Sequence, residues 1–174
     1  LWEDGWLRVF TDGSVDYPAD ERLARAGAGV YFWKAHPLNT GANVEGRGLN
    51  SYRAELQAAA MLLEGSRAWQ EKLWITLGNL AVVNDINDYM NGKRKKRLGN
   101  QDIWAKVEKY AKLRADEAKL KVTWTKGHAE DADIEAGRST EVERVRNKGA
   151  DGMADEGREE NARDESRVVE AIQR

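Results

Sequence analysis

The spacing of apolar residues changes along this chain, and that change constrains the fold more than any other feature. Apolar runs of strand length come first, over residues 6–10 and 28–33, and the segment 42–49 can supply a third, edge strand. From Ser51, the expected N-cap of a first helix, the spacing becomes helical. Further elements are expected as helices at 51–67, 79–90, 101–115 and 147–159 and as strands at 73–77 and 120–124. This order predicts an α/β fold whose sheet has an antiparallel side and a parallel side.

Composition excludes several kinds of chemistry. A chain of 174 residues can bury a substantial core, and we expect one domain over 1–160 with a charged extension at 161–174. There is no Cys and there are two His, which excludes disulfides, a thiolate zinc site, a cysteine nucleophile and a three-histidine metal site. The 28 Lys and Arg against 30 Asp and Glu give a net charge of −2, so nucleic acid binding would depend on where the charge lies.

The sequence also bears on location. It has neither an apolar run of membrane-spanning length nor a secretory pattern at its start, which predicts a soluble intracellular protein without membrane insertion. Nucleus, cytoplasm and organelle are not distinguished. The chain begins at Leu1 instead of Met, which is typical of a segment from which a leader or a neighbouring domain has been removed.

Three carboxylates lie near the ends of expected elements. Asp12 closes the first strand, Glu55 lies one turn into the first long helix, and Asp151 one turn into the last. Polar residues just past strand ends line the functional edge of such a sheet, and carboxylates are the ligands that hard divalent cations prefer. Each residue also has a structural interpretation, Asp12 as a turn residue and the other two as acids stabilised at a helix N-terminus.

Six short strings occur together in an order that narrows the choice. They are TDGS at 11–14, AGAGVYF at 26–32, HPLN at 36–39, YRAEL at 52–56, WTKGH at 124–128 and NKGADGMADEG at 147–157. Over about residues 6–158 the chain resembles type 1 ribonuclease H, and the pair GVYF and HPLN resembles the eukaryotic branch of that family.

The resemblance implies a ribonuclease H-like fold, a five-stranded mixed β-sheet flanked by α-helices, and cleavage of the RNA strand of an RNA/DNA hybrid by two Mg²⁺ ions, or Mn²⁺ in their place. Carried over by position, Asp12 would bridge both metals, while Glu55 and Asp151 would each hold one. His128 would assist proton transfer or product departure; the alternative is a surface loop imidazole without a role.

One expected metal ligand is missing. The family's third acid follows the central strand in a string resembling T-D-S, and Gly78 stands in that place. Asn79 is a neutral and weaker ligand, and Asp85 lies about 10 Å further along a helix, too far to substitute. We therefore predict little or no cleavage of hybrids in Mg²⁺. The residue types leave open whether Gly78 is natural or introduced.

Nucleic acid contacts are expected at two places. The resemblance puts Ser14, Ser51, Tyr52 and Arg53 on the hybrid-binding surface, with Ser51 and Tyr52 where the family has amides that read the minor groove. The basic run at Lys93, Arg94, Lys95, Lys96 and Arg97 lies where the family has a protrusion that grips the DNA strand. The alternative for this run is a solvated charged face or a localisation signal.

The segment 129–146 is longer than usual for the family. Arg138 is set against six acidic residues in this segment. They are Glu130, Asp131, Asp133, Glu135, Glu141 and Glu143. It is either a solvated insertion or, with the C-terminal tail, a docking surface for a protein partner. Three hypotheses remain: an impaired hybrid endonuclease, a module that binds hybrid or double-stranded RNA, and a pseudoenzyme serving as a structural subunit of a larger assembly.

Overall fold

A computed structural model describes residues 1–93 and 99–162 of the chain, with side chains described up to Glu159. The strands are β1 (Trp2–Glu3), β2 (Trp6–Asp16), β3 (Arg25–Tyr31), β4 (Thr40–Asn43), β5 (Leu73–Leu77) and β6 (Leu120–Trp124). The helices are α1 (Ser51–Gly65), α2 (Leu80–Met90), α3 (Gln101–Asp116), α4 (Asp131–Glu135) and α5 (Glu141–Ala162). None of these helices combines the length and apolar character needed to span a bilayer.

The strands form one mixed sheet in the order β4-β3-β2-β5-β6, with β1 paired to the start of β2. The β2–β3 and β3–β4 pairs are antiparallel, whereas β2–β5 and β5–β6 are parallel. The predicted division into an antiparallel and a parallel side is therefore confirmed. The parallel pairs bring the carboxyl ends of β2, β5 and β6 toward the same part of the sheet.

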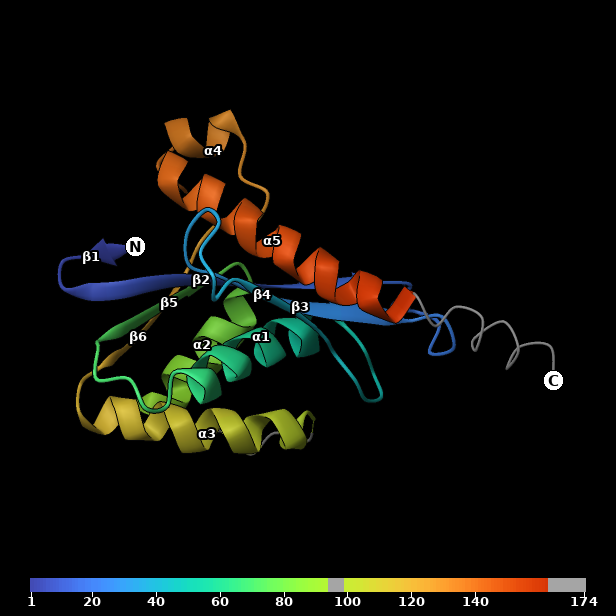
Figure 1. Ribbon diagram of the computed structural model, residues 1–174, viewed down its shortest axis with the longest axis horizontal. Coiled ribbons are helices and arrows are strands. Elements are labelled where there is room, and N and C mark those ends of the chain that lie inside the picture. The colour runs from blue at the N-terminus through green and yellow to red at the C-terminus, as the bar shows by residue number, and fades with distance from the viewer. Residues whose placement is uncertain (94–98, 163–174) are drawn as a thin grey trace.

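Helices cover the two faces of the sheet unequally. α1, α2 and α3 lie on one face, and α5 crosses the other face over β2, β3 and β4 (Figure 1). The main apolar core fills the space beneath α1 and α3, where Val9, Ile75, Leu56 and Trp104 are almost fully buried. A second cluster of small residues lies between α1 and the antiparallel strands. α5 does not cover β6, so the sheet near β6 is open on the face that α5 crosses.

Several element boundaries differ from the prediction because side-chain contacts decide them. β2 continues through Asp12 to Asp16, since β3 pairs with its whole second half. The N-cap of α1 is Asn50 and not Ser51, because the Asn50 Oδ1 accepts the Arg53 backbone N–H at 2.8 Å. The edge strand occupies 40–43, two residues earlier than the start expected at 42.

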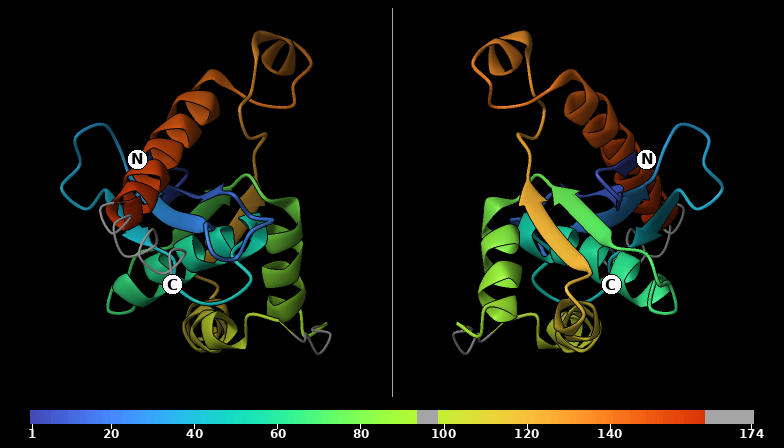
Figure 2. Two further views of the ribbon diagram at one scale, coloured as in Figure 1. Left: turned by 90° about the vertical axis from the view of Figure 1, so that its right-hand side faces the viewer. Right: turned by 90° about the vertical axis from the view of Figure 1, so that its left-hand side faces the viewer.

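The segment 129–146 folds into a projection, a name used here for those residues. It contains α4 and the first turns of α5, which therefore begins six residues earlier than expected, and its α4 end stands away from the sheet (Figures 1 and 2). α4 begins with a reciprocal capping box between Glu130 and Asp133. The extra residues of this segment therefore form α4 and the first turns of α5 and not an irregular loop.

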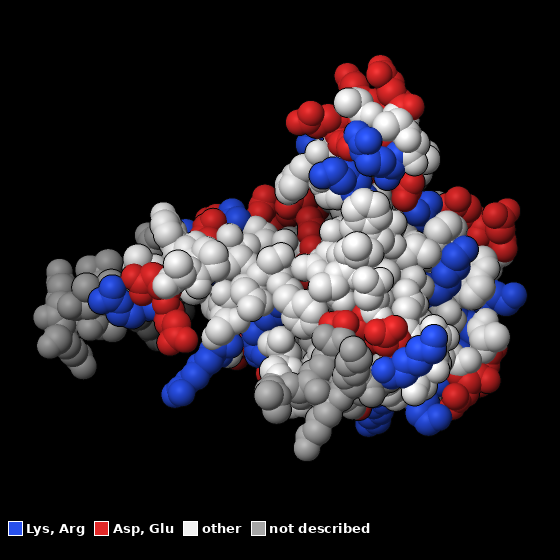
Figure 3. Space-filling view, turned by 180° about the vertical axis from the view of Figure 1, so that it is seen from behind, with Lys and Arg blue, Asp and Glu red and all other residues white. Residues whose placement is uncertain are grey.

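Arginines pair with four of the six acidic residues of the projection. Arg138 pairs with Asp133 at 2.8 Å, and Arg144 contacts both Asp131 and Glu141 at 2.6 Å. Glu143 pairs with Arg8 of β2 at 3.1 Å. Acidic and basic groups accordingly alternate on the projection, whereas the middle of the face below it carries few charges (Figure 3). The projection therefore repels phosphate less than its acid count suggests.

Candidate active site

Two glycines allow helices to approach Asp12 from opposite faces of the sheet. A Cβ on Gly13 would lie 2.6 Å from the Glu55 backbone N, so α1 packs directly against β2 at this point. Gly29 lies opposite Asp12 in the β2–β3 ladder, and a Cβ there would lie 2.4 Å from the Ala150 carbonyl oxygen of α5. The absence of these two side chains brings the backbones that carry Glu55 and Asp151 close to Asp12.

The carboxyl groups of Asp12 and Glu55 form a buried acidic pair. Asp12 is 8% exposed and Glu55 5%. Burial raises the pKa of Asp12 to about 6, and the charge of Asp151 adds to the rise, while hydrogen bonds from Glu55 and the Gly13 backbone N–H oppose it. Burial also raises the pKa of Glu55 well above its ordinary value, followed by repulsion from Asp12. Asp12 therefore makes Glu55 harder to ionise, burial raises the pKa of both groups, and a cation would relieve that cost.

The chemistry of these residues fits a hard divalent cation. Asp12, Glu55 and Asp151 offer carboxylate oxygens, and the Glu55 Oε2 is buried without a hydrogen-bond partner. Among the side chains that the structure describes, however, no group of three or more acidic or histidine residues is placed so that it could hold a metal ion. The assignment of these acids as metal ligands stays a prediction.

Gly78 lies beside Asp12 at the end of the central parallel pair. Thr11 is the register partner of Leu77, so the next residues along the two strands, Asp12 and Gly78, are neighbours. A Cβ at Gly78 would meet only Gly127 and Thr125 backbone atoms, at 3.6–3.7 Å. This is ordinary contact, so a side chain at position 78 has room beside Asp12.

The two residues considered as substitutes for the missing acid have other contacts. The Asn79 side chain caps α2 by accepting the Val82 backbone N–H at 3.2 Å. Asp85 accepts a hydrogen bond from the Tyr52 hydroxyl at 2.6 Å. Neither side chain therefore takes the place of a carboxylate at position 78.

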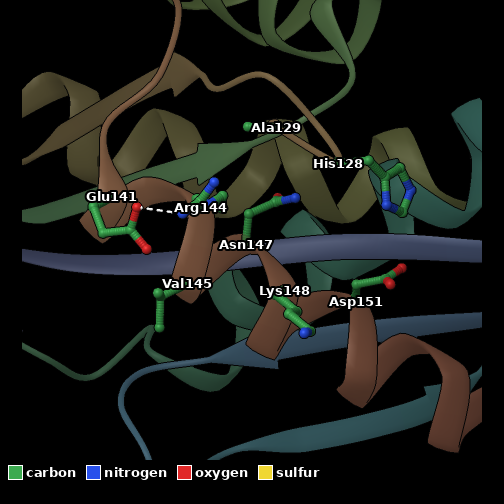
Figure 4. Close-up of a pocket in the computed structure, with 8 residues that line it drawn as sticks. All are labelled: His128, Ala129, Glu141, Arg144, Val145, Asn147, Lys148 and Asp151. Atoms are coloured by element: carbon green, nitrogen blue, oxygen red, sulfur yellow. Dashed lines mark hydrogen bonds and ion pairs between the residues drawn. The ribbon is translucent and has the colours of Figure 1, made fainter. Parts of the chain in front are cut away.

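His128 and Asp151 lie at the same end of a pocket of about 490 Å³ beside α5 (Figure 4). His128 adopts a left-handed backbone conformation with φ of 50°, which turns the chain after Gly127. Asn147, one helical turn before Asp151, is 5% exposed, and its Oδ1 has no hydrogen-bond partner. The sequence analysis did not select Asn147 as a site residue, although it belongs to the string at 147–157. Its spacing of four residues from Asp151 was the signal that both lie on one face of a helix.

The four polar residues predicted to touch nucleic acid are not equally available. Arg53 is 6% exposed, and its guanidinium pairs with Asp102 at 2.7 Å and donates to the Glu45 carbonyl oxygen. The structure therefore places Arg53 in a supporting role and not on the nucleic acid surface. Ser14 is likewise covered, donating to Asp155 at 2.7 Å and accepting from Arg158.

Ser51 and Lys93 are more accessible. Ser51 is exposed at the start of α1, and Tyr52 beside it is half-buried. Lys93 is exposed after α2, whereas Arg94, Lys95, Lys96 and Arg97 lie outside the described residues, as does the tail from 163 onward. Contacts of the basic run with DNA remain a prediction.

Comparisons with known proteins place this α/β domain in a family. The chain matches the RNase H family profile over residues 5–159. It is 36% identical over 88 residues to Ribonuclease H1 of Rattus norvegicus and 35% identical over 88 residues to that of Homo sapiens. The aligned segment covers 50% of this chain and 30% of each relative. The chain therefore belongs to the RNase H family, as a type 1 domain.

Solved structures support the same fold. The PFV RNase H domain superposes with a TM-score of 0.65 at 16% identity, covering 87% of this chain and 93% of that one. LC11-RNase H1, solved in complex with an RNA/DNA hybrid, gives a TM-score of 0.58 at 17% identity, with 89% and 98% coverage. These similarities confirm the predicted ribonuclease H-like architecture.

Proposed function

We propose that this domain binds RNA/DNA hybrids and is by descent an endonuclease for the RNA strand, with catalysis impaired by Gly78. The observation that carries the proposal is the placement of Gly78 beside the buried pair of Asp12 and Glu55. Membership of the RNase H family supports hybrid binding, and so does the exposure of Ser51 and Lys93, which are predicted to contact nucleic acid. Mg²⁺, or Mn²⁺, is the proposed cofactor.

The residues that remain have separable roles in this proposal. When bound, divalent ions would activate the attacking water and stabilise the leaving oxygen of the scissile phosphate. Asp12, Glu55 and Asp151 would hold these ions, and His128, at the same end of the pocket as Asp151, would move a proton or assist departure of the product. Without an acid at position 78 the ligand set is one charge short, so the affinity for at least one ion falls.

The test restores the missing acid. Gly78→Asp should raise cleavage of a labelled RNA/DNA hybrid in Mg²⁺ by about 100-fold or more, since regaining about 3 kcal/mol of barrier lowering has that effect. Gly78→Ala is the matched control, because it fills the same space with a Cβ that meets no close atom and adds no ligand. Adding Glu55→Gln to Gly78→Asp should abolish the gain.

Two results would contradict the proposal. If the unmodified chain cleaves hybrids as fast as Gly78→Asp, a fourth carboxylate is not needed. If Gly78→Asp gives no gain in either Mg²⁺ or Mn²⁺, the loss of activity extends beyond this position. Hybrid binding is measured separately in Ca²⁺, with residues 93–97 intact and with their charges neutralised.

A second candidate function is a pseudoenzyme that binds hybrid or double-stranded RNA without cleavage, or that serves as a structural subunit. Gly78 is the observation that favours it. In that case a protein partner would dock on the projection and on the extension at 161–174. Binding unchanged by neutralising the basic run, together with no gain from Gly78→Asp, would support the structural alternative over both nucleic acid functions.

A further inference from the structure

A second hollow, which we name the tryptophan pocket, lies on the other side of α5 from the candidate active site. It encloses about 740 Å³ between β2, β5 and β6 and the start of α5, and it is lined by Trp2, Trp33, Trp74 and Trp124. Leu1, Trp2 and Glu3 at the start of the chain also line it, and β1 can be found in Figure 1. Three of the indoles remain open to solvent, with exposed fractions of 58% for Trp2, 52% for Trp33 and 38% for Trp124. Aromatic surface of this extent in a concave site marks a binding surface.

Basic residues in the same pocket favour an anionic ligand. Arg146 is 3% exposed, and its guanidinium donates to the backbone carbonyl oxygens of Arg8 and Phe32. Within the described part of the chain no carboxylate forms an ion pair with it, and its Nε has no hydrogen-bond partner. Burial, and then repulsion from Arg8, lowers the pKa of Arg146 to about 10, so the group stays charged at neutral pH.

The remaining charges leave the pocket positive. Arg8 is shared between Glu3 at 3.0 Å and Glu143 at 3.1 Å, so the two acids that line the pocket are already paired. Lys121 is exposed on β6, with its ammonium 4.0 Å from the centroid of the Trp74 ring. Arg8 also lies over Trp74, at 3.9 Å. Trp74 thus positions two cations. The guanidinium of Arg146 lies 5.7 Å from the centroid of the Trp33 ring, and more than half of the Trp33 surface remains exposed.

We propose that the tryptophan pocket binds single-stranded nucleic acid, with a base stacked on Trp33 or a neighbouring indole and the adjoining phosphate held by Lys121, while the buried charge of Arg146 adds to the attraction. A nucleotide supplies a flat aromatic group and an anion within one repeating unit, which matches the mixture of indoles and cations here. A duplex is a poorer occupant because its bases are stacked internally and cannot lie on the indoles. The proposal goes beyond hybrid binding and does not depend on catalysis.

The pocket is joined to the candidate active site through one residue. Trp124 lines the pocket, and its Nε1 donates to the Gly78 carbonyl oxygen at 3.1 Å, beside Asp12. Single-stranded nucleic acid that extends from Asp12 and Glu55 would therefore meet Trp124 at the border of the pocket. The inference is that unpaired nucleic acid next to a hybrid is bound here.

The test measures binding of fluorescein-labelled oligouridylate and oligothymidylate octamers in EDTA, so that no divalent ion contributes. Trp33→Ala should weaken binding about tenfold. Lys121→Gln should weaken it less and reduce the slope of log affinity against log salt by about 0.7, the value for one phosphate contact on a single strand. Comparing the two octamers shows whether the sugar matters.

Matched controls keep the result specific. Tyr17→Ala removes another exposed aromatic side chain, and Lys109→Gln removes an exposed charge on α3, so both should leave octamer affinity within twofold. Thermal unfolding of each variant checks that its fold is retained. Octamer binding that Trp33→Ala and Lys121→Gln leave unchanged would overturn the proposal. Tighter binding of an acidic, aromatic-rich peptide, lost in the same two variants, would also overturn it by assigning the pocket to a protein.

Discussion

Replacing Asp12 by Asn should stabilise the metal-free protein at neutral pH, although Asp12 lies in the candidate active site. The pKa of this buried carboxyl is about 6, against an ordinary value of 3.8. The folded protein therefore binds a proton here more tightly than the unfolded chain does. The resulting cost is absent below about pH 4, grows as the pH rises to about 6, and is complete above that.

The size of this effect follows from the pKa difference. About two pH units correspond to about 3 kcal/mol of lost stability at pH 7.5, which is the upper limit of the gain expected from Asp12→Asn. The Asn side chain keeps an oxygen that can accept the Gly13 backbone N–H, now 2.9 Å from Asp12 Oδ1. Because repulsion from Asp12 also raises the pKa of Glu55, the gains of Asp12→Asn and Glu55→Gln should not add fully.

The assay is urea unfolding in EDTA at pH 4 and at pH 7.5. Asp12→Asn should match the unmodified protein in stability at pH 4 and exceed it at pH 7.5. Glu135→Gln, at an exposed acid, should match the unmodified protein at both pH values. Adding Mg²⁺ should then stabilise the unmodified chain more than the variant, because ligand binding to the folded state adds stability. A variant that is less stable than the unmodified protein at pH 7.5 would refute the electrostatic reasoning.

Three further predictions concern packing, hydrogen bonding and charge. Gly29→Ala should destabilise the fold by several kcal/mol in chemical unfolding, because its Cβ would lie 2.4 Å from α5 backbone atoms; Gly65→Ala, where no atom lies within 4 Å, should change stability by less than about 1 kcal/mol. Tyr52→Phe should cost about 1–3 kcal/mol in urea unfolding by removing the hydroxyl that donates to Asp85, and an equal loss in a protein that already carries Asp85→Ala would argue against this cause. Gly78→Asp should lower metal-free stability at neutral pH and increase the stabilisation by Mg²⁺ in thermal unfolding, whereas Gly78→Ala should change neither.

Much of the architecture could be predicted because the relevant signals are local. The helical spacing after Ser51 and the apolar run at 73–77 predicted α1 and β5 nearly to the residue. The boundaries that were missed depend on partners distant in sequence. β2 extends to Asp16 because β3 pairs with it, and α5 begins at Glu141 within a segment whose arginines pair with surrounding acids.

The candidate site, too, could be predicted from the sequence only in part. Residue types and order predicted Asp12, Glu55 and Asp151 as metal ligands and Gly78 as the place of a missing one, and these assignments stay predictions. Burial of Arg53 against Asp102 could not be read from the chain, because the two residues are 49 positions apart and meet only when α1 packs near the start of α3.

The sequence by itself determined the family and the order of the main strands and helices, because these depend on residue identity and short-range periodicity; it did not predict β1 or α4. Only the tertiary structure decided the pKa values of the ionisable groups and which charges lie next to one another. Burial raises the pKa of Asp12, pairing neutralises most of the projection, and the indoles and cations of the tryptophan pocket come together from distant segments. Charge interactions depend on distance and on exclusion of water, and both are set by packing.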